Sequence, residues 1–309
     1  MRRMLEGRIG AAPLLLLTLA LALPACSIRQ MAINSLGNAL AEAGDSYGSD
    51  EDPELVGAAI PFGLKTIESL LAEAPEHEGL LYAAVSGFAQ YAYAFVEQDA
   101  DFVEDRDYRR ATELRERARK LYLRARDYGL RGLEVDFAGF RGRLRDDPDA
   151  ALAKTKREHV RFLYWTGAAW AAATSLAVDD PELTADQFQV EALVRRALAL
   201  DEDFEDGAIH EFFLAWEGGR PEAAGGSVER AREHFERAVA ISDGQRAFPF
   251  VSFAETVSVA RQNRDEFEDL LQQALAIDVD VKPSARLANL IAQERARWLL
   301  DRSDELFIE

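Results

Sequence analysis

A histidine beside a glutamate is the first pattern in this sequence that could do chemistry. Zinc metalloproteases hold their metal with His-Glu-x-x-His, which places two imidazoles on one helical face. His210 and Glu211 start such a pattern, but position 214 is Leu, so the second ligand is missing. The other histidines, His77, His159 and His234, are scattered without metal-ligand spacing. We therefore predict no metal site.

Isolated glutamates could act as general acids, because an apolar pocket raises the pKa of a carboxyl group, as in all-helical transglycosylases. Glu68 and Glu211 are candidates by their neighbourhood alone. With 55 Asp and Glu in the chain, however, a Glu beside apolar residues is more often a packing or capping residue. The sequence also lacks Gly-x-Gly-x-x-Gly and a Walker loop. We expect no cofactor and no enzyme activity, with a cell-wall hydrolase as an alternative.

Aromatic side chains gather in three short stretches and suggest a ligand cavity. Tyr91 and Phe95 lie one helical turn apart, whereas Tyr93 must point elsewhere, so the rings occupy more than one face. Such rings either fill the space between two helix layers or line a groove, as in apolar ligand sites. The candidates for a cavity wall are Phe88, Tyr91, Phe95, Tyr164, Trp165, Trp170, His210, Glu211, Phe212 and Trp216.

Positive charge is concentrated in residues 115–126, although the chain as a whole has a formal net charge of −19. The basic residues there are Arg115, Arg117, Arg119, Lys120, Arg124 and Arg126. Interleaved acids at Glu113, Glu116 and Asp127 favour ion pairs along a solvated helix face. The alternative is a surface for an acidic partner. The overall negative charge excludes nucleic acid as a partner, since a phosphate backbone needs a positive stripe.

The N-terminus has the features of an export signal. Three arginines precede a run over residues 14–23 that is apolar except for Thr18, which is too short to span a bilayer but typical of a signal peptide. Leu23-Pro24-Ala25-Cys26 resembles a bacterial lipobox, so the only cysteine, Cys26, is the predicted lipid attachment point. The alternative is an ordinary secretory signal with Cys26 as a spare thiol. Ser27, in place of an inner-membrane retention Asp, favours the outer membrane. We expect attachment to the membrane through this lipid only.

Three regions follow from these features: a signal peptide over 1–25, a lipid anchor and N-terminal helix over 26–52, and an α-helical domain over 53–309. Removal of residues 1–25 takes away three Arg and one Glu, which changes the net charge from −19 to −21. Asp-Pro pairs at 52–53, 147–148 and 180–181 are typical of helix starts or turns.

Apolar residues recur at helical spacing, and no segment alternates as a strand would, so the predicted fold class is all-α. Leu81, Val85 and Phe88, for example, fall on one helix face. The irregular stretch is expected at 129–148. We predict helices over 28–43, 53–74, 77–98, 107–129, 149–178 with a break near 156, 186–200, 205–217, 222–241, 249–262, 264–277 and 284–301.

Degenerate repeats support antiparallel helical hairpins. The second helix of a tetratricopeptide unit carries Ala-x₃-Phe-x₂-Ala, in which small residues allow close approach and the aromatic ring fills the gap. This spacing occurs at Ala231, Phe235, Ala238 and at Ala118, Tyr122, Ala125, with weaker copies at Phe267, Leu271, Ala274 and Val190, Val194, Ala197. The intervals between copies are irregular, so ordinary Ala-rich amphipathic helices remain the alternative to a tetratricopeptide-like solenoid.

Longer motifs resemble those of the TRAP transporter T-component (TatT) lipoproteins, where TRAP stands for tripartite ATP-independent periplasmic. The opening motifs are PFGLKTIESLL at 61–71 and GFAQYAYAFV at 87–96. The resemblance continues in order through residues 117–125, 163–170, 207–211, 234–235 and 286–290.

This resemblance implies a periplasm-facing, lipid-anchored protein that forms a homotrimer and has a pore or cavity through each protomer. It also implies docking to the periplasmic solute-binding protein of a TRAP transporter and uptake of an organic, hydrophobic ligand. An outer-membrane assembly or secretion scaffold lipoprotein is the alternative that also uses helical repeats to hold its partners.

Overall fold

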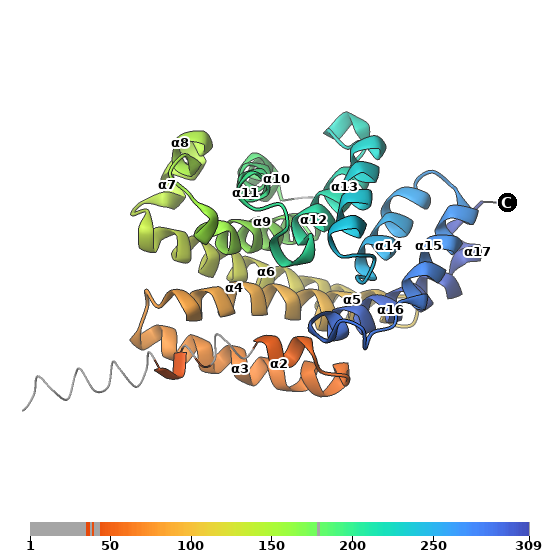
Figure 1. The fold of residues 1–309 in the computed structure, drawn as a ribbon, viewed down its shortest axis with the longest axis horizontal. Helices are drawn as coiled ribbons and strands as arrows, with labels where there is room; N and C mark the ends of the chain where they lie inside the picture. The colour runs from red at the N-terminus through yellow and green to blue at the C-terminus, as the bar shows by residue number, and fades with distance from the viewer. Residues whose placement is uncertain (1–34, 38, 40–43, 178–179, 309) are drawn as a thin grey trace, which may run out of the picture.

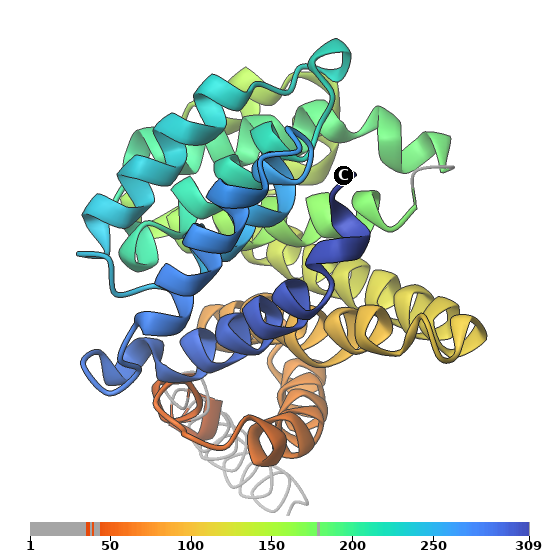
Figure 2. The same cartoon turned by 90° about the vertical axis from the view of Figure 1, so that its right-hand side faces the viewer.

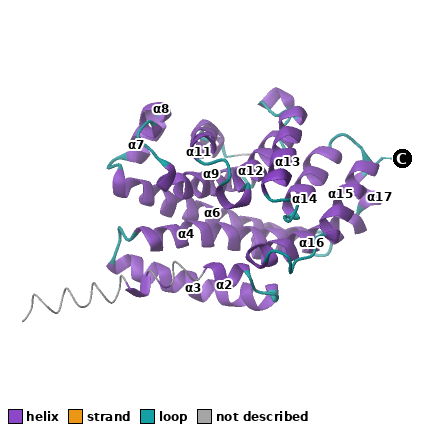
Figure 3. Cartoon of the chain, in the orientation of Figure 1, coloured by secondary structure: helices purple, strands orange, loops and turns teal. Residues whose placement is uncertain are grey.

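The computed structural model describes residues 35–37, 39, 44–177 and 180–308 (Figure 1). These residues form α-helices, short 3₁₀ and π segments and loops, and contain no strand (Figure 3). The predicted all-α class is therefore confirmed for this part of the chain. Cys26 and most of the helix expected over 28–43 lie outside the described residues.

The first half of the fold consists of helices that pack against their neighbours in the chain. In order they are α2 (Gly44–Gly48), α3 (Pro53–Glu73), α4 (Glu78–Ala92), α5 (Gln98–Val103), α6 (Tyr108–Asp136), α7 (Phe140–Asp146), α8 (Pro148–Leu152), α9 (Val160–Ser175), α10 (Pro181–Ala185) and α11 (Gln187–Leu200). α4 packs on α3 and α6, and α9 packs on α6 and α11. The buried side chains of these helices make one continuous apolar core that extends to α12.

The second half has its own apolar core. It contains α12 (Ala208–Gly218), α13 (Val228–Ile241), α14 (Phe248–Phe253), α15 (Arg264–Ala276), α16 (Arg286–Asp301) and α17 (Ser303–Leu306). α12 and α13 form a closely packed pair, as do α15 and α16.

Local signals explain where several helices begin. The Asp52 side chain accepts a hydrogen bond from the Leu55 amide at 3.0 Å, with Pro53 in the first turn of α3. Asp147 does the same for the Ala150 amide at the start of α8. Both arrangements satisfy an amide that would otherwise lack a partner at the helix start. Asp180 likewise accepts from the Leu183 amide at 3.3 Å at the start of α10, so all three Asp-Pro pairs are confirmed as helix starts.

The repeat motifs form the buried faces of four helices. Ala118, Tyr122 and Ala125 of α6 are at most 2% exposed, so this face is fully covered. The small and apolar motif positions of α11, α13 and α15 are buried as well, at Val190, Val194, Ala197, Ala231, Ala238, Phe267, Leu271 and Ala274. The motif thus marks helix contacts, while the tetratricopeptide-like arrangement stays a prediction.

The C-terminal helix α16 returns to the beginning of the fold. It contacts α2 and α3. Its Trp298 ring packs on Phe102 of α5 with centroids 5.5 Å apart, and Arg286 donates to the Ser49 carbonyl at 2.9 Å. Figure 2 shows α16, in dark blue, beside the yellow and orange N-terminal helices. In an open solenoid each repeat contacts only its neighbours. The contacts of α16 with the N-terminal helices are not expected for such a solenoid.

The segment 129–148, expected to be irregular, is largely helical. α6 continues to Asp136 and α7 follows. Glycine allows α6 to pack closely on α9 in this segment, because a Cβ at Gly132 would come within 2.2 Å of the Phe162 ring. Gly129 and Gly132 therefore serve helix packing, whereas Gly139, with a φ of 72°, forms the turn before α7.

Two helical stretches are long and apolar enough to cross a membrane by length and composition, Pro53–Glu73 and Glu78–Val103. More than half of the second is buried inside the protein, as is usual for the core helix of a globular domain. The first leaves Leu55 and Phe62 exposed on its outer face.

Candidate functional site

Three elements that are distant in the chain meet at Glu205. This residue lies on the 3₁₀ turn Phe204–Asp206, between α11 and α12, and its φ of 46° falls in the left-handed region. The Tyr82 hydroxyl of α4 and the Trp165 indole N–H of α9 both donate to Glu205 Oε1, at 2.9 and 3.0 Å. The Tyr164 ring packs edge-on against Trp165, with centroids 5.0 Å apart. We call Glu205, Tyr82, Tyr164 and Trp165 the Glu205 site.

Glu205 is an exposed residue, but protein surrounds its carboxyl group. More than a third of the residue is accessible, yet desolvation raises its pKa, opposed by the Trp165 and Tyr82 hydrogen bonds. Among the described residues, Oε2 has no hydrogen-bond partner. Oε2 is therefore the oxygen of this carboxylate that the described side chains leave free.

A buried ion pair lies next to this site. Arg246 donates to both carboxylate oxygens of Glu211, at 2.5 and 2.7 Å, and the two side chains are 18% and 6% exposed. Burial lowers the pKa of Arg246, but Glu211 more than offsets this, so the pKa is raised. Glu211 is thus fully compensated, which leaves Glu205 as the carboxylate of this region without a bound cation.

The predicted cavity residues separate into several places. Tyr164, Trp165 and Glu211 come together around Glu205, as described above. Phe212 and Trp216 stack on each other along α12, at 5.5 Å, and Trp216 lies under the Arg220 guanidinium. Trp170 is buried beneath Arg126 of α6.

The aromatic residues of α4, and Phe95 in the π segment Tyr93–Glu97 that follows it, face other neighbours. Phe88 stacks on Tyr128 of α6 with centroids 5.9 Å apart, and the Tyr91 hydroxyl accepts a hydrogen bond from Arg117. Phe95 lies against Tyr91 and close to α3 at Gly57. These rings join α4 to α3 and α6 rather than to the Glu205 site.

His210 pairs with another histidine. Its Nδ1 lies 2.9 Å from Nδ1 of His234 on α13, and its Nε2 lies 3.7 Å from Glu202. Among the residues that the structure describes, no group of three or more His, Cys, Asp or Glu could hold a metal ion.

A second buried polar cluster was not suggested by the sequence. It lies where two π segments, Tyr93–Glu97 and Ala254–Ser258, approach α16. Tyr122 donates a hydrogen bond to Glu97, and desolvation raises the Glu97 pKa to about 7. Arg295 forms ion pairs with Asp101, at 2.8 Å, and with Glu255. π segments are frequent at functional sites, but no motif in the sequence distinguishes them from ordinary helix.

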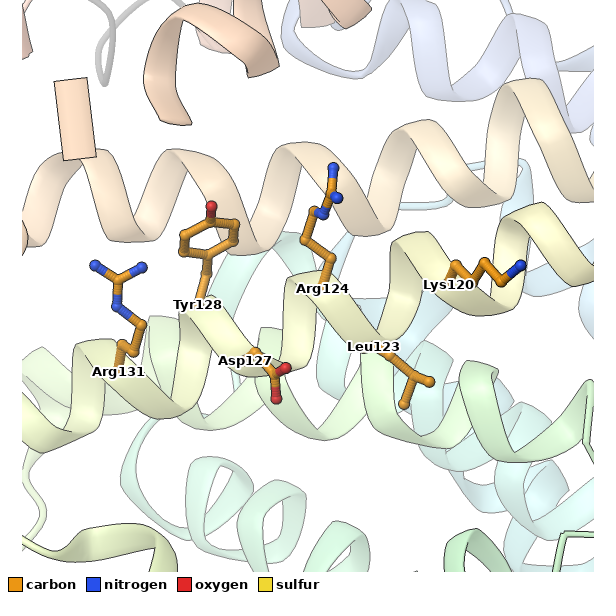
Figure 4. A pocket seen from close by; sticks show the side chains of 6 residues that line it. All are labelled: Lys120, Leu123, Arg124, Asp127, Tyr128 and Arg131. Carbon is orange, nitrogen blue, oxygen red and sulfur yellow. The ribbon is translucent and has the colours of Figure 1, made fainter. Parts of the chain in front are cut away.

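The basic stretch of α6 is partly an ion-paired surface, as its charge pattern predicted. Arg119 and Lys120 both pair with Glu116, at 2.9 and 3.2 Å, and the pKa of Glu116 is lowered to about 2, chiefly by Arg119. One face of α6 also lines a shallow recess of about 410 Å³, shown in Figure 4. Its wall consists of Lys120, Leu123, Arg124, Asp127, Tyr128 and Arg131.

Glu68 lacks the surroundings of a general acid. Burial raises its pKa, but hydrogen bonds from Lys65 and from Tyr128, with the charge of Arg124, outweigh burial and leave the pKa lowered. The carboxyl group therefore stays ionised rather than holding a proton to donate. Of the two carboxyl candidates, Glu68 is held by cations and a tyrosine and Glu211 by Arg246.

Comparison with known proteins identifies the family to which this chain is related. The model of the TRAP transporter T-component family matches residues 49–307, which is most of the chain. An uncharacterized protein of Treponema pallidum (strain Nichols) is 28% identical over 302 residues, covering 92% of this chain and 94% of that protein. The matched region spans the Glu205 site, the π segments and α6. The chain belongs to the TRAP transporter T-component family.

Proposed function

We propose that this protein is a periplasm-facing accessory subunit of a TRAP transporter that binds the solute-binding protein and holds it at the membrane. The observation that carries this proposal is the family match over residues 49–307. Both carboxyl candidates for catalysis are engaged with cations, which favours a binding role over an enzymatic one.

The anchor in this proposal is a lipid on Cys26 at the periplasmic side of the outer membrane. Two or more acyl chains hold a protein stably at a bilayer, whereas one chain does so only marginally. Metabolic labelling with a fatty acid tests the anchor: the wild-type protein should incorporate the label, and Cys26→Ala should not. Equal labelling of both proteins would place the lipid elsewhere.

A ligand space is the second part of the proposal. The free Oε2 of Glu205, beside the Tyr164 and Trp165 rings, supports a recess for an organic ligand. Aromatic walls with a small number of polar groups are typical of ligand sites in proteins.

The recess on α6 is the proposed docking face. The wall carries more cations than anions: Lys120, Arg124 and Arg131 outnumber its single carboxylate, Asp127, and Lys120 and Arg124 also pair with Glu116 and Glu68 outside it. Complementary charge steers association and selects partners. An acidic edge of the solute-binding protein fits this surface.

Titration calorimetry with the TRAP solute-binding protein of the same organism tests the proposal. We expect saturable binding, and at least tenfold weaker binding by Lys120→Glu/Arg124→Glu. A matched control is the double reversal Arg109→Glu/Arg145→Glu, which changes the same charge on exposed side chains outside the recess. Absence of binding would reject the accessory role, and equal loss in both variants would reject this docking face.

A further inference from the structure

We propose that the Glu205 site binds an organic cation, of the substituted-ammonium class. The inference deepens the proposed ligand recess and rests on it. Four observations support a positively charged ligand: the free oxygen of Glu205, the local charge, the aromatic faces and the backbone of the turn.

Glu205 is held in place while half of its carboxylate stays open. Tyr82 and Trp165 both donate to Oε1, and neither reaches Oε2. The Tyr164 hydroxyl likewise has no hydrogen-bond partner in the part of the chain that the structure describes, and its pKa is raised by burial and then by the charge of Glu205. A buried carboxylate normally forms ion pairs or several hydrogen bonds, because desolvating a charge is costly. Oε2 is thus free to accept a proton or positive charge from a ligand.

The local charge is not balanced by the protein. Arg246 is engaged with both oxygens of Glu211, so Glu205, Glu211 and Arg246 together carry one excess negative charge when Glu205 is ionised. Arg161 lies over the Tyr82 ring at 5.3 Å, but it forms its ion pair with Glu78. An anionic ligand would meet repulsion here, whereas a cation would complete the charge.

Aromatic rings next to the carboxylate suit a cation with methyl or methylene groups. Tyr164 packs against Trp165 at 72° and against Phe204 with centroids 5.5 Å apart. Cations bind the faces of such rings, with Trp the strongest, and contribute about 0.5–2 kcal/mol per contact. Because Arg161 covers Tyr82 and Tyr164 is only 8% exposed, the partly exposed Trp165 is the ring that would contact the ligand.

The turn that carries Glu205 adopts a costly backbone. Glu205 and Asp206 have φ values of 46° and 59°, a region that non-glycine residues seldom occupy. The ion pair of Asp206 with Lys282, at 2.7 Å, holds this turn. Strain of this kind persists where the surrounding structure determines it and is concentrated at binding sites.

Paired titrations test the proposal on the full-length protein in detergent. Choline and its uncharged isostere 3,3-dimethylbutan-1-ol have similar shapes, so the difference between them reports the charge. We expect saturable binding of choline, or of the smaller tetramethylammonium and methylammonium ions. Calorimetry and Trp fluorescence measure this binding. The neutral alcohol should bind at least tenfold more weakly than choline.

Two variants and one control complete the test. Glu205→Gln keeps the acceptor for Tyr82 and Trp165 but removes the charge, and should weaken cation binding at least tenfold. Trp165→Leu removes a ring and should weaken it as well, which covers the case in which Glu205→Gln does not fold. Glu202→Gln removes one charge from a neighbouring, more exposed position and should change affinity less than twofold.

Three results would overturn the proposal: no saturable binding of any of the three cations, equal affinity for choline and the neutral alcohol, or unchanged affinity in Glu205→Gln. Binding of the neutral alcohol alone would retain the ligand recess and reject only the cation. Calorimetry with the solute-binding protein is independent of these titrations, so the failure of the accessory function would be recognised separately.

Discussion

The Nδ1 atoms of His210 and His234 lie 2.9 Å apart, across the contact between α12 and α13. At this distance one ring donates a proton to the other, so at least one of the two imidazoles is neutral. The His234 ring also stacks on Phe213, with centroids 5.1 Å apart. Desolvation, followed by the charge of His210, lowers the His234 pKa to about 4. Desolvation lowers the His210 pKa as well.

This pair predicts a loss of stability in acid. Because the folded pKa of His234 lies below its unfolded value of 6.5, its contribution to the free energy of unfolding is present above pH 6.5. That contribution is lost as the pH falls toward 4. His234→Asn should remove about 1–3 kcal/mol of this pH dependence, measured by urea unfolding between pH 4 and 7. His77→Asn, at the N-cap of α4, should retain the His210–His234 contribution. An unchanged slope in His234→Asn would contradict the assignment.

The contribution of Glu97 to the free energy of unfolding should depend on pH in the opposite direction to that of His234. Its folded pKa of about 7 lies above the value of 4.5 for a free glutamate, so its contribution to stability is full below pH 4.5 and is lost as the pH rises through 7. Glu97→Gln should therefore gain up to about 3 kcal/mol relative to wild type at pH 8 compared with pH 4.5. Urea unfolding at the two pH values gives this difference. The exposed Glu116, with a pKa lowered to about 2, provides a control in Glu116→Gln, which should show no such gain.

The ion pair between Arg246 and Glu211 should be costly to break from one side. Arg246→Met leaves a buried carboxylate without a cation, and we expect a loss of about 3 kcal/mol or more in the free energy of unfolding. The double variant Arg246→Met/Glu211→Leu should recover much of that loss, because no charge remains to be desolvated. Arg145→Met breaks a pair whose side chains are 71% and 73% exposed, and should cost less than about 0.5 kcal/mol. Equal effects of the two single variants would contradict this interpretation.

Close packing of α6 on α9 makes Gly132 irreplaceable. An added Cβ would come within 2.2 Å of the Phe162 ring, so Gly132→Ala should destabilise the fold by about 1–3 kcal/mol. Gly142 on α7 has no atom within 4 Å of such a Cβ, and Gly142→Ala should instead stabilise it by about 0.5–1 kcal/mol. Thermal unfolding of both variants should show midpoint shifts of opposite sign.

We predict that protomers contact one another through the outer face of α3. Leu55 and Phe62 are 59% and 80% exposed, and large apolar side chains on an open surface are typical of interaction sites. If the protein is a homotrimer through this face, Phe62→Asp should shift its mass by light scattering from trimer to monomer. Tyr108→Asp changes another aromatic side chain, 71% exposed on α6, and should leave the mass unchanged. A trimer in both variants would exclude the α3 face.

Local interactions are what the sequence by itself determined. Apolar spacing predicted most helices within a few residues, since one buried face requires that spacing. Asp52 and Asp147 marked helix starts because a cap satisfies amides only three residues away. The motif in α6, at Ala118, Tyr122 and Ala125, identified a buried face for the same reason.

Only the tertiary structure decided how distant residues meet. Tyr82 and Glu205 are 123 positions apart, and Trp165 is 40 from Glu205, so no local pattern connects them. Predicted rings such as Phe88 and Trp170 proved to contact α6, because ring type indicates burial but not the neighbour. The pKa values of Glu97 and Glu205 depend on desolvation by surrounding helices, and a carboxylate in the sequence carries no information about which atoms will enclose it.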